Sequence, residues 1–276
     1  MTLISSLRGG LPSRTEVCTG TCSRSTAGPD ELRYIRGAIV PRADWRTPVS
    51  EELEVFRCAR SAVPLCVERL RLSAAIWDSF EDLRRTIRST ESLALARNQA
   101  ASDRWHEAIA SVTDLLRDFT ADSGKSFAGV GLCVHPPGLP TVTFDESRNG
   151  FIGLHLDHWY DSQTPEDSPN RFCINLGYES RYFLFSPRSI SALRQARSHP
   201  GMNLADSELA RAYLRAFPDS PVIRLRVDPG EAYIAPTECI SHDGSTQGQS
   251  GWDLTLTVRG RFMSPSLGAS LTEVCL

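Results

Sequence analysis

The chain has 276 residues, 41% of them hydrophobic, which is enough to bury one sizeable core. Its formal net charge is −3, so no basic excess favours nucleic acid, and we expect no nucleic-acid partner. No apolar run approaches the ~20 residues that span a bilayer, so we expect no membrane partner either.

The N-terminal composition and the cysteines predict a cytoplasmic protein with a loose N-terminal arm. The first residues have only a short apolar start, so a signal peptide is not expected. The eight cysteines are scattered without CxxC pairs, a pattern typical of reduced thiols. Residues 1–30 are rich in Ser, Thr, Gly and Arg, which predicts a flexible arm.

Residues 31–122 are predicted to form a helical support region. Charged and apolar residues alternate at helical spacing over 51–63 and 66–88. The clearest segment is 102–119, where apolar residues recur every three or four positions. This stripe, which predicts a helix packed on a sheet, consists of Trp105, Ile109, Val112, Leu116 and Phe119.

Residues 123–276 change to short apolar or alternating segments separated by Pro, Gly, Asn and Asp. They predict eight strands, at 129–135, 141–145, 151–156, 171–178, 181–185, 222–227, 231–235 and 252–262. A helical insertion is expected at 187–217, with Asp206 as an N-cap. Strands that follow helices predict an α+β fold, a jelly roll (double-stranded β-helix) catalytic core braced by N-terminal helices.

A metal site is predicted from three residues in this core. His155 and Asp157 are two apart, so on a strand they point to the same face. The stretch from Asp228 to His242 contains a Pro-Gly turn, a short strand and Pro236 before the histidine. In a jelly roll, a strand near the C-terminal end lies beside the early strand with His155. Two histidines and one carboxylate on one face form the facial triad of iron(II) oxygenases.

The order of His155-x-Asp157, His242 and a later arginine resembles the iron(II)/2-oxoglutarate-dependent oxygenase superfamily, over about residues 125–265. The Pro-Gly-Glu stretch before His242 also resembles the second metal motif of cupins and Jumonji-type oxygenases. The resemblance implies Fe(II), 2-oxoglutarate and O2 as cofactor and cosubstrates. Halogenating relatives have Gly or Ala where this chain has Asp157, so hydroxylation is implied, or a desaturation or cyclisation that begins with the same hydrogen abstraction.

The tail carboxylate of 2-oxoglutarate needs a fixed cation, and arginine provides a two-pronged donor. Residues 252–262 alternate, and Arg259 and Thr257 share the polar face, which makes Arg259 the first candidate. The interval from His242 is slightly longer than is usual in the superfamily, and a loop insertion at 244–251 would absorb the difference. Arg261 has the same parity as Arg259 and is the first alternative. Jumonji-like members use a cation on an earlier strand, where Arg171 would serve, and Asn175 shares the parity of Arg171.

Other interpretations stay open. A metallo-hydrolase of the HxHxDH type would need a histidine where this chain has Gly153. A cupin enzyme without 2-oxoglutarate would not need Arg259, and a non-catalytic binding protein would not need three metal ligands. The expected substrate is a small molecule, an amino acid or natural-product intermediate; the oligomeric state is open. Three acids near the ligands in sequence would bind a cationic substrate or be solvated: Asp161, Glu238 and Asp243.

Overall fold

The computed structural model describes residues 4–6, 14–24, 32–52, 68–117, 120, 127–157, 168–196 and 205–262. A six-stranded sheet is its largest element, in the order β1-β5-β12-β9-β14-β6, and every neighbouring pair is antiparallel. We call it the large sheet. Its strands are β1 (Ile4–Ser6), β5 (Glu68–Leu72), β6 (Gly129–His135), β9 (Asn170–Asn175), β12 (Glu231–Ala235) and β14 (Asp253–Gly260).

Two four-stranded sheets lie beside it, in the orders β13-β10-β11-β2 and β3-β4-β8-β7. Only β4 and β8 pair in parallel among the described strands. An isolated bridge between His155 and His242 joins the two sheets. Their strands are β2 (Thr15–Cys18), β3 (Thr21–Arg24), β4 (Tyr34–Pro41), β7 (Phe144–Asp145), β8 (Gly150–Gly153), β10 (Arg181–Ser189), β11 (Val222–Val227) and β13 (Ile240–Ser245).

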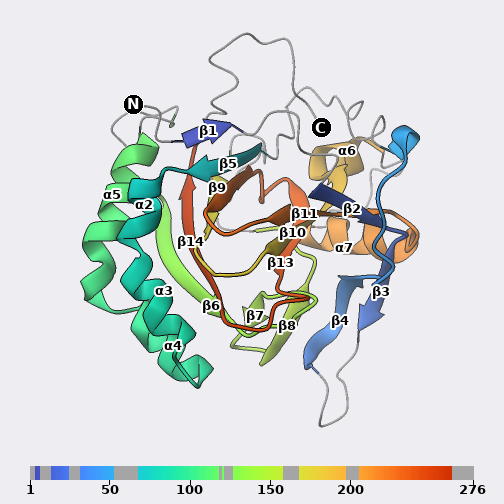
Figure 1. Cartoon of the computed structure of the whole chain (residues 1–276). Coiled ribbons are helices and arrows are strands. Elements are labelled where there is room, and N and C mark those ends of the chain that lie inside the picture. The colour runs from blue at the N-terminus through green and yellow to red at the C-terminus, as the bar shows by residue number, and fades with distance from the viewer. Residues whose placement is uncertain are drawn as a thin grey trace.

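Helices cover the outer face of the large sheet (Figure 1). They are α2 (Ala74–Ser79), α3 (Glu81–Arg88), α4 (Leu93–Ala100), the 3-10 turn η2 (Asp103–Trp105) and α5 (His106–Arg117). The predicted stripe packs into this layer, since Trp105, Val112 and Leu116 are buried against Phe172 and Leu256 of the sheet's core cluster. Phe119 lies outside the described residues.

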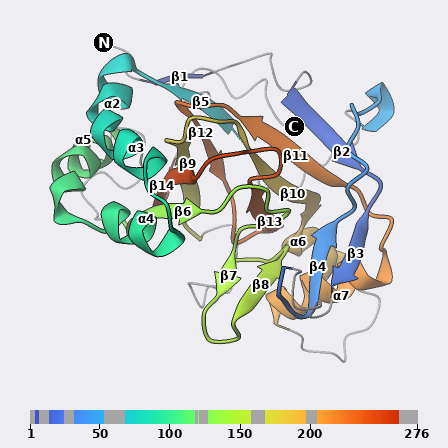
Figure 2. The same cartoon turned by 60° about the horizontal axis from the view of Figure 1, so that its bottom comes forward.

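A second core fills the space between the large sheet and the β13-β10-β11-β2 sheet. Tyr233 and Cys173 of the large sheet meet Phe183, Ile223 and Leu225 there. Tyr233 and Phe183 stack with ring centroids 4.3 Å apart. The helices α6 (Ile190–Gln195) and α7 (Asp206–Ala216) lie on the far side of the β13-β10-β11-β2 sheet. They are opposite the α2–α5 layer in both views (Figures 1 and 2). The arrangement is therefore layered, with strand alternation deciding which residues face which core.

The mixed α+β class is confirmed, with mainly antiparallel sheets. The strands expected at 129–135, 222–227 and 231–235 have the expected bounds, and the others differ at their ends. The insertion is present as α6 and α7, but Asp206 is not the N-cap. Ala205 holds that position, and the Asp206 carboxylate instead accepts hydrogen bonds from the Arg194 guanidinium at 2.9 and 2.6 Å.

Three sequence expectations need correction. Residues 68–72, expected to be helical, form β5, because their alternation is stabilised by pairing with β12. The expected helical support region also contains β4. In the predicted N-terminal arm, β2 pairs with β11 and buries Val17 and Cys18 completely. Much of 51–63 lies outside the described residues, and the boundaries at 30 and 122 stay predictions.

Candidate metal centre

Local backbone structure brings His155 and His242 side by side. Gly153 ends β8 with a φ of 70°, and a Cβ there would lie 2.3 Å from the backbone oxygen of Ile39. Only glycine fits this approach to β4. The chain then turns toward β13, where the His155 amide donates to the His242 carbonyl at 3.1 Å and the His242 amide donates back at 2.8 Å.

Asp157 completes a cluster with these two histidines. One ligand atom from each of the three residues lies within 4.8 Å of the others. The Asp157 carboxylate is 3.8 Å from His155 Nε2 and 3.7 Å from His242 Nε2. His242 and Asp157 are almost fully buried, at 1% and 5% exposure. The three residues predicted from sequence therefore converge on one small, largely enclosed point.

The hydrogen bonds of the two imidazoles orient them for a metal. His155 Nδ1 lies 2.9 Å from the Gly153 carbonyl, and His242 Nδ1 lies 3.1 Å from the Ile240 carbonyl. A carbonyl can only accept, so each Nδ1 carries the proton and each Nε2 keeps its lone pair. His242 Nε2 is buried, and no described residue hydrogen-bonds to it. Two lone pairs and one carboxylate aimed at a common point fit a divalent transition metal.

The surroundings also set the protonation states that coordination needs. Burial lowers the pKa of His242 to about 3, so the ring is neutral at neutral pH. Burial alone would raise the pKa of Asp157, but the neighbouring His242, Arg171 and Arg259 outweigh it and hold this pKa well below its usual range. A neutral imidazole and an ionised carboxylate are the forms that bind metal.

Two of the predicted cosubstrate residues reach this cluster. Arg259 of β14 lies directly opposite Arg171 of β9 in the sheet register. Arg171 donates from Nη2 to Asp157 Oδ2 at 2.6 Å. Arg259 forms an ion pair with the same Asp157 oxygen and donates from Nη1 to Glu238 at 3.1 Å. The polar face of β14 is thus buried rather than solvated, with Arg259 only 8% exposed.

The other predicted cosubstrate residues lie differently. Thr257 is on the same strand face as Arg259, opposite Cys173, whose sulfur lies 3.8 Å from its hydroxyl. Arg261 follows the end of β14 and is exposed. Because the strand ends at Gly260, alternation no longer places Arg261 on the same face as Arg259. Asn175 is fully buried, and its amide nitrogen donates to the Val227 carbonyl at 2.8 Å while its oxygen accepts from the Gly177 amide at 2.9 Å. These bonds give Asn175 a structural role.

Two acids near the ligands in sequence are buried rather than solvated. Glu238 pairs with Arg259, as described above. Asp243 is 1% exposed, and its Oδ1 accepts from the Thr143 hydroxyl at 2.8 Å and the Gly244 amide at 2.7 Å. Its Oδ2 lies 4.0 Å from His155 Nδ1. His155 Nδ1 already donates to the Gly153 carbonyl, so Asp243 acts on this ring through its nearby charge and not through a hydrogen bond. Asp161 lies outside the described residues.

An ionic cluster at the other end of β14 was not anticipated from sequence. Asp253 has no exposed surface and lies 3.6 Å from the buried Arg181. His135 Nδ1 is 3.0 Å from the same carboxylate. The alternation of 252–262 puts Asp253 on the face of Arg259, and this signal could have indicated its burial.

Comparisons with protein-family models and with curated protein sequences find no match to this chain. Within the described part of the chain, no helix combines the length and apolar character needed to cross a membrane. The described cysteines are free thiols: Cys18, Cys22, Cys133, Cys173 and Cys239.

Proposed function

We propose that the strands from β6 to β14 form a double-stranded β-helix. Four of them, β6, β14, β9 and β12, are neighbours in the large sheet. The other major strands, β8, β13, β10 and β11, lie side by side once the His155–His242 bridge is counted. Along the chain, β6, β9, β12 and β14 thus alternate with strands of the second set. This crossing between two facing sheets is what a jelly roll requires.

We propose that the protein is a non-haem Fe(II)/2-oxoglutarate-dependent oxygenase that hydroxylates a C–H bond of a small metabolite. The convergence of His155, Asp157 and His242, with both Nε2 lone pairs free to coordinate, carries this proposal. When bound, iron supplies the oxygen chemistry with 2-oxoglutarate and O2, and succinate and CO2 are released with the hydroxylated product. The chain's own groups hold the metal in place, exclude water and position the reactants.

Arg171 is the residue that we assign to the distal carboxylate of 2-oxoglutarate. Arg259 already pairs with Glu238 as well as Asp157. Among the described residues, Arg171 forms an ion pair with Asp157 alone. The Nε of Arg171 is buried, and no described residue hydrogen-bonds to it. A second carboxylate would satisfy this guanidinium.

We place the small dicarboxylate next to these arginines, beside Gly131. Gly131 of β6 lies directly opposite Thr257, so it shares the face of β14 that carries Arg259. A Cβ built on Gly131 would meet nothing within 4 Å. The absence of a side chain at this position supports a bound small molecule on that face.

The metal proposal is tested with Fe(II) added to the metal-free protein under anaerobic conditions. We expect one Fe(II) per chain, and a weak visible charge-transfer band that appears only when 2-oxoglutarate is added. His155→Ala and His242→Ala should abolish iron binding, whereas His106→Ala, which removes an exposed histidine of α5, should retain it. No band, together with no succinate from any pool of small metabolites, would contradict the proposal. Retained zinc with ester or phosphoester hydrolysis would favour a metallo-hydrolase.

The cosubstrate assignment is tested with three arginine variants. Arg171→Met should retain iron but raise the concentration of 2-oxoglutarate needed for the band at least about tenfold, the effect of losing one charge-assisted hydrogen bond. Arg261→Met is the matched control, because this arginine is exposed beyond the end of β14. Normal affinity in Arg171→Met with a loss in Arg259→Met would transfer the role to Arg259.

A further inference from the structure

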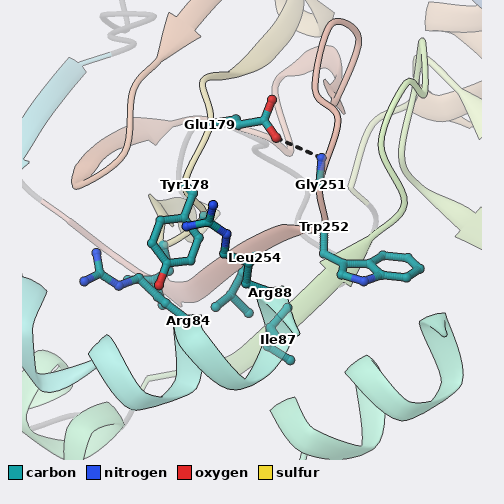
Figure 3. A pocket seen from close by; sticks show the side chains of 10 residues that line it. Arg84, Ile87, Arg88, Tyr178, Glu179, Gly251, Trp252 and Leu254 are labelled. Atoms are coloured by element: carbon teal, nitrogen blue, oxygen red, sulfur yellow. Dashed lines mark hydrogen bonds between the residues drawn. The ribbon is translucent and has the colours of Figure 1, made fainter. Parts of the chain in front are cut away.

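A pocket lies on the outer face of the large sheet, away from the proposed metal centre. It is formed by α3, the turn after β9 and the start of β14, and has a volume of about 310 Å³ including the space open to solvent (Figure 3). Its floor contains Ile87 and Leu254, which belong to the core beneath α2–α5. The metal centre lies on the opposite face of the same sheet, so the two sites are separate.

Arg84 is a buried charged residue that lines this pocket. Its side chain is only 4% exposed, and no described residue hydrogen-bonds to its Nε or Nη1. Its Nη2 donates to Glu81, which is shared with Arg85. The guanidinium lies over the Trp77 ring at 3.5 Å from the centroid. Burial lowers the pKa of Arg84, because the charged form has lost water without gaining enough partners.

A second cation faces the same space. The Tyr178 ring lies between the Arg84 and Arg88 side chains in Figure 3, with its centroid 5.4 Å from the first guanidinium carbon and 4.9 Å from the second. Glu179 also lines the pocket, but its carboxylate accepts from the Ser250 amide and hydroxyl and from the Gly251 amide. Figure 3 shows it turned toward that loop and away from Arg84.

We propose that this pocket binds the carboxylate group of a small organic acid. Arg84 offers two buried nitrogens without a hydrogen-bond partner among the described residues, and Arg88 supplies a second positive charge at the rim. Guanidinium groups match carboxylates in geometry and charge. The walls formed by Ile87, Leu254 and Trp252 suit a short apolar body attached to that carboxylate. The site does not rest on the proposed metal chemistry.

Calorimetric titration of the full-length, metal-free protein with butyrate tests this proposal, in a chloride buffer at constant ionic strength. We expect one butyrate per chain, bound more tightly than acetate or inorganic phosphate. Arg84→Met and Arg88→Met should each weaken butyrate binding at least about tenfold, the effect of losing one charge-assisted hydrogen bond. Arg85→Met is the matched control, because Arg85 lies on the same helix, is exposed and does not line the pocket.

Two further comparisons separate this pocket from other sources of binding. Arg171→Met should bind butyrate as well as the unaltered protein does, because Arg171 belongs to the metal centre. Arg88 is exposed, so Arg88→Met should fold even if loss of the buried Arg84 disturbs the packing of α3. The proposal is overturned if butyrate does not bind, if phosphate binds more tightly than butyrate, or if Arg85→Met or Arg171→Met weakens binding as much as Arg88→Met.

Discussion

Replacing His242 by glutamine should make the stability of the metal-free protein less sensitive to acid. Burial lowers the pKa of His242 to about 3 from its ordinary value of 6.5. Between these two pH values the unfolded chain binds a proton at His242 and the folded protein does not. The free energy of unfolding therefore falls as the pH falls through this window.

The size of the effect follows from the same two values. Each pH unit inside the window lowers the free energy of unfolding by about 1.4 kcal/mol for one proton. The window spans about 3.5 pH units, so the whole effect is on the order of 4–5 kcal/mol. The pKa of Asp157 is lowered, so its contribution is lost only below the ordinary carboxyl range. Burial raises the pKa of Asp243, whose contribution therefore has the opposite sign, so the difference between the unaltered protein and His242→Gln is what reports on His242.

Urea unfolding followed by tryptophan fluorescence measures this dependence. His242 should account for a loss of about 2–3 kcal/mol between pH 6.5 and 4.5, seen as a lower midpoint at constant slope. His242→Gln should remove most of that loss, while His106→Gln, which changes an exposed histidine, should not. An equal loss in His242→Gln and the unaltered protein would refute the argument that the fold holds His242 neutral for coordination.

Three further variants test particular contacts. Asp243→Asn should weaken Fe(II) binding in a titration, because it removes a buried carboxylate 4.0 Å from His155 Nδ1; an unchanged affinity would contradict this role. Arg181→Met should lower the free energy of unfolding by about 3–5 kcal/mol in urea, since Asp253 keeps a buried charge, and adding Asp253→Leu should restore much of the loss. Gly153→Ala should lower the thermal midpoint clearly, because the new Cβ would clash with the backbone oxygen of Ile39. Gly131→Ala should leave the midpoint unchanged, because a Cβ there meets nothing within 4 Å. Equal midpoints for the two variants would contradict this reasoning.

Alternation and turn residues were enough to predict most strands of the C-terminal half. The segments at 222–227 and 231–235 are apolar, bounded by Pro, Gly and Asp, and their bounds agree with β11 and β12. The same alternation put Arg259 and Asp253 on one face of β14. The predicted strand at 151–156 ends at Gly153, so His155 and Asp157 are brought together by the backbone bonds of His155 to His242 and of Asp157 to Thr237 rather than by strand alternation.

Long-range pairing explains what the sequence did not predict. The residues of β13 are Ile-Ser-His-Asp-Gly-Ser, which have no strand-like composition, yet all six are buried by pairing with β10. Tertiary context overrides local propensity in such segments. The hydrogen bonds of Asn175 to Val227 at the end of β11 and to Gly177 were likewise not indicated by parity, and a contact of Asn175 with the cosubstrate stays a prediction.

The side chains at the two ends of the inner face of the large sheet differ in exposure. Asp253 and Arg259 are six positions apart on β14, so the two ionic clusters are separated by roughly 20 Å at about 3.4 Å per residue. At one end, the side chains of Arg181 and Asp253 are only 4% and 0% exposed, and the neighbouring His135 side chain is 17% exposed. At the other end, the Arg171 side chain is 22% exposed beside the buried Asp157. We therefore propose that a small molecule approaches from the Arg171 side, where the first cation that it would meet is the one that we assign to the cosubstrate carboxylate.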